Sequence, residues 1–198
     1  LSDREEKKLL TRITTILKDR SIDAVVFQDY NKGVLSHSVI SSVIDLVQKR
    51  NIPTLVDPKF NNFWSYQKVT LFKPNFKEVN TGLKQRLDPE ISSLVKASNE
   101  IRKRLHHEIS MITLSDKGIF VDDGTQTFIL PAHPRSIADV CGAGDTVVSI
   151  AALGIALELD IRTISVLANA AGGQVCEKIG VVSVDKDDLL KDVINQRD

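Results

Sequence analysis

The sequence has few cysteines, no excess of either charge and no long apolar run. Its two cysteines, Cys141 and Cys176, are too few for a disulfide framework and match no metal-ligand spacing, which fits a reducing cytoplasm. Lys plus Arg equal Asp plus Glu at 26 each, so no net field indicates DNA, RNA or an anionic membrane as a partner. We find no run of about 18 apolar residues and no leader pattern. These absences predict a cytoplasmic protein that binds neither nucleic acid nor membrane.

Internal repeats, low-complexity stretches and Gly/Ser linkers are also missing, so we expect one domain over residues 1–198. Hydrophobic residues make up 42% of the chain, which is enough to bury a full core. Short apolar runs alternate with segments of helical periodicity. The predicted strands are 23–27, 54–56, 69–72, 109–114, 119–121 and 127–130. The predicted helices are 3–19, one that begins at Ser36, and 89–105, 146–159 and 161–178.

This alternation favours an α/β fold with a mainly parallel sheet, because right-handed crossovers place helices on both faces. The turn residues Asp122, Asp123 and Gly124 separate the last two strands, which should therefore form an antiparallel hairpin. Sheets of this kind bind ligands at the carboxyl ends of their strands. We therefore expect the functional site at that edge.

The strongest local signal is a glycine-rich turn that leads directly into an apolar helix. Gly142, Ala143 and Gly144 are followed by Asp145. Free N–H groups and the dipole at a helix start form an anion site, and no side chain blocks the approach of phosphate at the glycines. A carboxylate there would repel a nucleotide, but it suits a base for an attacking hydroxyl. We therefore predict a phosphate loop at 142–144 and a general base at Asp145.

The same turn also allows a simpler interpretation, in which Asp145 is a first-turn residue favoured by the helix dipole. The turn is not a Walker loop, because no Lys-Ser/Thr follows the glycines, and it lacks the third glycine of a dinucleotide fingerprint. The longer stretch 138–157, ADVCGAGDTVVSIAALGIAL, resembles the second signature of the ribokinase-like (PfkB) carbohydrate kinases, in which DxxGAGD ends with the catalytic aspartate. This resemblance implies a three-layer ribokinase-like fold and ATP-dependent phosphoryl transfer to a sugar hydroxyl.

Two further resemblances concern metal ions. Asn75 and Glu78 match the family's NxxE motif, which organises Mg²⁺ and phosphate through water. Asp139 matches a family position near a monovalent cation such as K⁺, and Gly180 and Ser183 lie in the segment that contributes to that site. Read alone, the first pair is better explained as a plain helix start, and Asp139 is equally a helix cap.

Other segments resemble the family's nucleotide contacts. The stretch 113–118 is similar to the TxGxxG strand end that contacts triphosphate and nucleoside, with Ser115 where Gly is usual. The stretch 169–173 resembles the small-residue helix that walls the adenine pocket. The residues implied as ATP contacts are Thr113, Ser115, Lys117, Gly118, Asn169 and Gly173.

Two segments narrow the resemblance within the family. Residues 29–35 and 56–59 look like the DYxKGxL and VDPK segments of the kinases that phosphorylate the anomeric oxygen of D-glycero-D-manno-heptose 7-phosphate, on the route to ADP-heptose for lipopolysaccharide. Such kinases occur alone or as the first half of a bifunctional ADP-heptose synthase. The resemblance implies Asp29, Lys32 and Lys59 as substrate contacts. Read alone, each lysine is equally a solvated surface residue.

The resemblance begins partway into the family pattern, without its first strand, glycine-rich substrate signature and β lid. We therefore expect the C-terminal, nucleotide-binding part of one kinase domain, with weak or no phosphate transfer on its own and a homodimer in the full-length protein. Another sugar or nucleoside kinase of the family and a non-catalytic nucleotide-binding fragment remain open. A Rossmann oxidoreductase is disfavoured, because no glycine fingerprint follows the first strand. Four residues match no motif and are predicted at the surface or in loops: His37, His106, His107 and His133.

Overall fold

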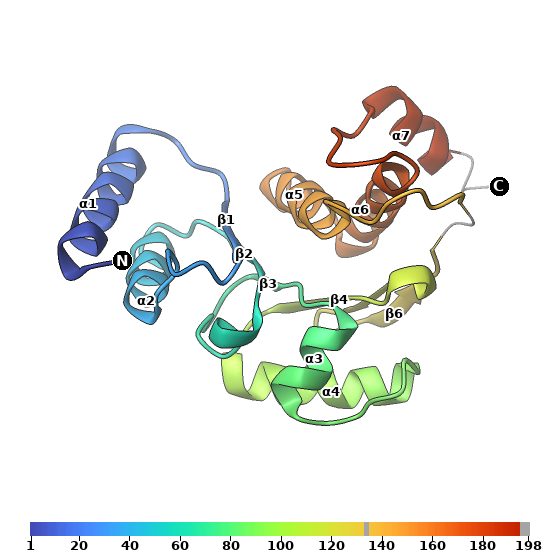
Figure 1. Cartoon of the computed structure of the whole chain (residues 1–198), viewed down its shortest axis with the longest axis horizontal. Helices are drawn as coiled ribbons and strands as arrows, with labels where there is room; N and C mark the ends of the chain where they lie inside the picture. The colour runs from blue at the N-terminus through green and yellow to red at the C-terminus, as the bar shows by residue number, and fades with distance from the viewer. Residues whose placement is uncertain (133–134, 195–198) are drawn as a thin grey trace.

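The computed structural model describes residues 1–132 and 135–194 of the chain. Its centre is a six-stranded sheet with the strands in sequence order (Figure 1). The strands are β1 (Val25–Gln28), β2 (Thr54–Asp57), β3 (Leu71–Phe72), β4 (Ile109–Thr113), β5 (Ile119–Asp122) and β6 (Thr127–Leu130). β1 to β4 are parallel, and β5 and β6 are antiparallel to their neighbours. The predicted parallel sheet with a terminal hairpin is confirmed.

Seven α-helices occur in the described part of the chain: α1 (Asp3–Asp19), α2 (His37–Gln48), α3 (Phe76–Leu83), α4 (Ile91–Leu105), α5 (Ala143–Ala156), α6 (Ile161–Cys176) and α7 (Lys186–Ile194). Side-chain caps fix several starts, as Ser36 Oγ accepts from the N–H of Val39 at the start of α2. Within residues 1–132 and 135–194, no helix combines the length and apolar character that crossing a bilayer requires. The apolar periodicity did not predict α3, because its eight residues span only about two turns.

The sheet is covered on both faces, as expected for a three-layer fold. Side chains along each strand alternate, so Val56 and Phe72 pack with α1 to α4, whereas Leu55 and Leu71 pack with α5 and α6. Figure 1 shows α5, α6 and α7 on one side of the sheet and α2, α3 and α4 on the other. On the α5 side, Gly154 lets α6 approach closely, because a Cβ there would lie 2.7 Å from Ile164.

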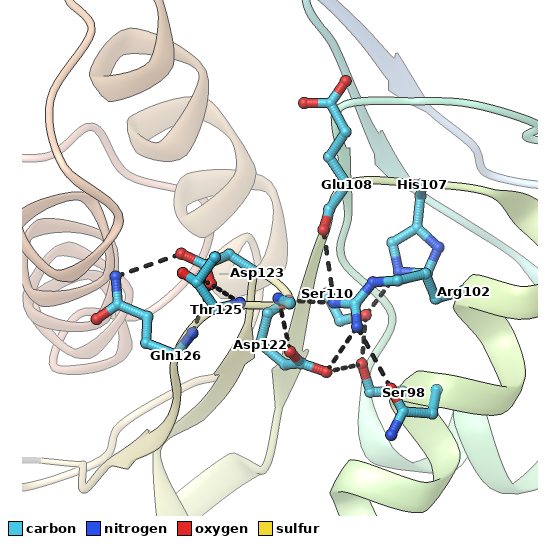
Figure 2. Close-up of polar contacts among 11 residues, drawn as sticks. Ser98, Arg102, His107, Glu108, Ser110, Asp122, Asp123, Thr125 and Gln126 are labelled. Carbon is cyan, nitrogen blue, oxygen red and sulfur yellow. Dashed lines mark hydrogen bonds and ion pairs between the residues drawn. The ribbon is translucent and has the colours of Figure 1, made fainter.

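A buried polar cluster lies between α4 and the sheet, far in sequence from the glycine-rich turn. Figure 2 shows His107, Ser110 and Ser98 in a row that ends at the Asp122 carboxylate, with Arg102 on its other side. The distances along this row are 2.6 Å from His107 Nε2 to Ser110 Oγ, 2.8 Å between the serine oxygens, and 2.6 Å from Ser98 Oγ to Asp122 Oδ2. Arg102 donates to the same Oδ2 atom at 3.0 Å and to the backbone oxygen of Asp122 at 2.7 Å.

This cluster corrects one sequence-based prediction. His107 was expected at the surface or in a loop, but it is only 2% exposed, and burial lowers its pKa to about 3. The prediction was wrong because His107 is buried by tertiary contacts: its direct partner, Ser110, lies in β4, and the hydrogen-bonded row continues to Ser98 of α4 and Asp122 of β5. His37 and His106 are exposed as predicted, and His133 lies outside the described residues.

Candidate active site

A groove of about 730 Å³ lies at the carboxyl ends of the parallel strands, where the sequence places the functional site. The predicted residues that line it are Lys59, Asn75, Thr113, Ser115, Gly118, Gly142, Ala143, Gly144, Asp145, Asn169 and Gly173. The predicted residues outside its lining are Asp29, Lys32, Glu78, Lys117, Asp139, Gly180 and Ser183. The structure thus brings together segments from four strand ends, α5 and α6.

The glycine-rich turn forms the start of α5. Gly142 is the N-cap with a φ of 78°, a left-handed conformation that favours glycine. Gly144 lies close to Asp57 and Lys73, because a Cβ there would be 3.4 Å from Asp57 Oδ2 and 3.5 Å from Lys73 Nζ, which is ordinary contact distance. The first turn of α5 therefore packs beside a buried ion pair.

Lys73 and Asp57 make this ion pair. Their Nζ and Oδ1 atoms are 3.2 Å apart, and the Lys73 side chain is only 2% exposed. Gln28 Nε2 donates to the second oxygen of Asp57 at 3.0 Å. The Oδ1 atom accepts no hydrogen bond of good geometry, so its stabilisation comes from nearby positive charge. Sequence reasoning did not select either residue, although a lysine at the end of a buried strand was a usable signal.

Lys59 extends the pair into a chain of alternating charges. Its Nζ atom lies 3.6 Å from Asp57 Oδ1 and 2.8 Å from Glu78 Oε1. Desolvation opposes the charged amine, but the hydrogen bond with Glu78 and the two carboxylate charges outweigh it, so the pKa of Lys59 is raised. Two cations and two carboxylates balance each other here.

The predicted base, Asp145, is the third residue of α5. Its Oδ2 atom accepts a hydrogen bond of 2.7 Å from the hydroxyl of Tyr30, which follows β1. This hydrogen bond to the carboxylate raises the pKa of Tyr30. The sequence gave no reason to join these two residues, because they are 115 positions apart.

The NxxE segment forms a helix start at the edge of the groove. Asn75 caps α3, since its Oδ1 accepts from the N–H of Glu78 at 2.8 Å while Glu78 Oε2 accepts from the N–H of Asn75 at 2.8 Å. Asn75 also lines the groove and bridges to Thr113 at the end of β4. The two motif segments 75–78 and 113–118 thus meet at one edge of the sheet.

The segment after β4 is tightly constrained. Gly118 has a φ of 92°, and a Cβ there would lie 1.9 Å from the carbonyl oxygen of Leu130, so no other residue fits. Ser115, which stands where the family has glycine, has a φ of 60°. A serine in this left-handed conformation is strained by roughly 1 kcal/mol. Lys117 is exposed and lies outside the groove lining.

The far end of the groove is built from α6. Asn169 Nδ2 donates to the carbonyl oxygen of Pro131 at 2.8 Å, and Gly173 leaves room for Arg135, whose Nε would lie 2.9 Å from a Cβ at that position. Arg135 makes ion pairs of 2.8 Å with Glu177 and 2.6 Å with Asp192. Sequence reasoning missed Arg135, which joins α6 and α7 beside the groove.

The predicted substrate residues lie in three different environments. Asp29 is 2% exposed, and its carboxylate accepts hydrogen bonds from Asn31, Asn62 and Tyr66. Lys32 is exposed, whereas Lys59 lines the groove. Of the three, Lys59 therefore has direct access to a ligand in this groove.

The predicted monovalent-cation residues come together only in part. Asp139 Oδ2 accepts from the N–H of Gly180 at 3.0 Å, and Oδ1 accepts from the N–H of Cys141 at 3.1 Å. These hydrogen bonds lower the pKa of Asp139. The helix-cap interpretation of Asp139 is wrong, because Gly142 is the N-cap of α5. Ser183 is exposed, and the described residues contain no cluster of three or more His, Cys, Asp or Glu able to hold a metal ion.

Comparison with curated proteins identifies several relatives described as bifunctional protein HldE. That of Campylobacter jejuni is 39% identical over 93% of this chain, which corresponds to 39% of the relative. That of Methylobacillus flagellatus is 34% identical over 100% of this chain and 40% of the relative. The chain thus spans about two fifths of the length of these proteins.

Solved structures with the same fold include a phosphofructokinase and a ribokinase. Phosphofructokinase-2 from Escherichia coli in complex with potassium has a TM-score of 0.87 at 21% identity, covering 100% of this chain and 64% of that one. Ribokinase from Arabidopsis thaliana, complexed with ribose and ATP, has a TM-score of 0.74 at 18% identity, covering 98% and 59%. At these identities the likeness shows the ribokinase-like fold alone.

The family model described as pfkB family carbohydrate kinase matches residues 17–188. This range includes all six strands and the start of α5 with its glycines and aspartate. The chain therefore belongs to the pfkB family of carbohydrate kinases.

Proposed function

We propose that this chain is the nucleotide-binding, catalytic part of a single ribokinase-like kinase domain that transfers the γ-phosphoryl group of ATP to a sugar hydroxyl. The observation that carries the proposal is the position of Asp145 in the first turn of α5, within a groove lined by Lys59 and Lys73. Backbone N–H groups of the helix start provide positive potential for phosphate, and Lys59 and Lys73 can pair with its oxygens in exchange for Asp57 and Glu78. The carboxylate beside them suits a base for the acceptor.

In this reaction the sugar hydroxyl gives its proton to Asp145 as its oxygen attacks the γ-phosphorus of ATP. A bond forms between the sugar oxygen and phosphorus, the bond to the β,γ-bridging oxygen breaks, and ADP leaves. Base catalysis contributes roughly 100 to 10,000-fold, while positioning and charge stabilisation supply most of the acceleration. Lys59, Lys73 and the amides of residues 142–144 serve that second role.

The family's Mg²⁺ fits the residues present. Oxygen donors of Asp57 and Asn75 line the groove, and Mg²⁺ is usually bound by one or two carboxylates together with substrate phosphates. We assign its water-mediated contacts to Asn75 and Glu78, and a monovalent cation such as K⁺ to Asp139, Gly180 and Ser183. When bound, Mg²⁺ neutralises charge on the phosphate oxygens.

The specific acceptor that we propose is D-glycero-D-manno-heptose 7-phosphate, phosphorylated at its anomeric oxygen for ADP-heptose and lipopolysaccharide synthesis. The DYxKGxL and VDPK segments support this choice, because they supply Tyr30 and Lys59 to the groove. The similarity to relatives described as bifunctional agrees with a kinase joined to a second activity. We also propose that the complete gene product is a homodimer in the cytoplasm.

The test is a substrate screen of the complete gene product, with Asp145→Asn as the matched inactive variant. We expect ATP-dependent phosphorylation of the heptose 7-phosphate, with no other sugar phosphate or nucleoside turned over at a comparable kcat/KM. The variant should lose at least 100-fold in kcat and bind ATP with unchanged affinity, because the amides and lysines remain. Preference for another sugar would refute the heptose assignment and indicate a different sugar kinase of the same family. Wild-type turnover by Asp145→Asn would refute the catalytic assignment.

A further inference from the structure

The contact between Tyr30 and Asp145 is unusual for a surface tyrosine. The Tyr30 residue is 56% exposed, so core packing does not determine where its ring lies. Its hydroxyl nevertheless donates to Asp145 Oδ2 at 2.7 Å across 115 positions of sequence. Hydrogen bonds to a carboxylate are roughly twice as strong as those between neutral groups. This one joins the loop after β1 to the start of α5.

The residues on either side of Tyr30, in the loop after β1, are held in place by hydrogen bonds. Asp29, directly before it, is buried and accepts hydrogen bonds from Tyr66 at 2.8 Å and Asn62 at 2.9 Å. Its other oxygen accepts from the N–H of Asn31 at 2.7 Å, and Asn31 has a φ of 57°. This Asx turn fixes the backbone on both sides of Tyr30. Asp29, predicted as a substrate contact, thereby acts on the groove through its neighbour.

We propose that Tyr30 is a positioning residue on the acceptor side of the active site, whose phenol holds one oxygen of Asp145 and leaves the other to face the sugar hydroxyl. This inference rests on the proposed function, in which Asp145 is the base. A carboxylate free to rotate presents its oxygens in many directions, whereas one held at Oδ2 is preorganised for the attacking group. The other charged groups acting on Tyr30 are Asp57 and Lys59, which lie at and just after the end of the neighbouring strand β2.

The contact itself is testable in the isolated chain without any turnover. The chain has two tyrosines, and the buried Tyr66 has a pKa raised by burial and by Asp29, so the first tyrosinate formed on raising the pH belongs to Tyr30. The Asp145 carboxylate raises the pKa of Tyr30, and the variant Asp145→Asn should therefore let Tyr30 ionise at a lower pH. Tyrosinate absorbance followed during an alkaline titration measures both curves, and Tyr30→Phe identifies the step.

The functional consequence is tested in the complete gene product with Tyr30→Phe, which removes only the hydroxyl. We expect kcat to fall on the order of tenfold while the KM for ATP stays within about twofold, because the phosphate loop is unchanged. Val34→Ala, on the same loop and 49% exposed, is the control and should keep wild-type kinetics. Thermal unfolding of each variant excludes a loss of fold as the cause.

The outcomes distinguish failure of the proposed role of Tyr30 from failure of the proposed kinase function. If Asp145→Asn is inactive but Tyr30→Phe turns over at the wild-type rate, the positioning role is wrong and the kinase assignment stands. If Asp145→Asn leaves the Tyr30 titration unmoved, the hydrogen bond does not exist in solution and the inference fails directly. If Asp145→Asn is fully active, the base is misassigned, and Tyr30 has no base to position.

Discussion

Lowering the pH should reduce the free energy of unfolding of this protein, because His107 is a buried, neutral imidazole. Desolvation and, next, the charge of Arg102 lower its pKa from 6.5 to about 3. A histidine whose pKa is lowered by folding stabilises the native state fully above its unfolded pKa, and this stability is lost as the pH falls below 6.5 toward the folded value. Between pH 7.5 and pH 5 the free energy of unfolding should fall by about 2 kcal/mol, because His107 binds a proton in the unfolded chain but not in the native chain.

The hydrogen bonds around His107 explain why it cannot accept that proton. The Asp122 carboxylate only accepts, so Ser98 must donate to it, Ser110 must donate to Ser98, and His107 Nε2 must donate to Ser110. Nδ1 is then an unprotonated nitrogen, and it is buried without a partner among the described residues. A proton there would be a second positive charge beside Arg102 with no acceptor of its own.

The matched variant is His107→Gln, which retains an N–H donor for Ser110 and does not titrate. Urea unfolding at pH 7.5 and pH 5 gives the decrease in the free energy of unfolding for each protein. The difference between the two decreases is the contribution of His107, because all other titrating groups are the same. We expect the free energy of unfolding to fall by about 2 kcal/mol more in the wild type than in the variant over this pH interval. Equal losses would refute the buried, neutral state of His107. An NMR assignment of the proton to Nδ1 would refute the direction of the hydrogen-bond row.

Two further predictions concern the backbone of the groove. Gly144→Ala should bind ATP as the wild type does, because a Cβ meets Asp57 and Lys73 at ordinary contact distance, whereas the larger Gly144→Val should weaken binding roughly tenfold by displacing that pair. Titration calorimetry with an ATP analogue compares the two, and equal affinities would contradict the packing. Ser115→Gly should raise the free energy of unfolding by about 0.5 to 1 kcal/mol through relief of its positive φ. A lower melting temperature in scanning calorimetry would count against this strain.

The sequence predicted those parts of the fold that depend on local pattern. Strands and long helices were visible because apolar runs and amphipathic periodicity are local, and the turn at 142–145 was visible because its glycines, its aspartate and the apolar helix that follows are consecutive in sequence. α3 was short enough to escape the periodicity. The contacts Tyr30–Asp145 and Asp57–Lys73 were not visible, because each depends on the order in which the strands lie in the sheet. A family resemblance located the segments, but it did not show which side chains meet.

In the proposed function, the ion pairs beside the glycine-rich turn would influence how ATP binds in the groove. Lys59 and Lys73 are both held by carboxylates before any nucleotide arrives, and Lys73 is buried under Gly144. A triphosphate can recruit these ammonium groups only in competition with Asp57 and Glu78, which lose partners in return. Part of the binding energy would therefore go into exchanging ion pairs, and Mg²⁺, if bound beside Asp57 and Glu78, would supply these carboxylates with a replacement positive charge. We accordingly expect ATP without Mg²⁺ to bind this groove much more weakly than the Mg²⁺ complex, and equal affinities in calorimetry would contradict the exchange.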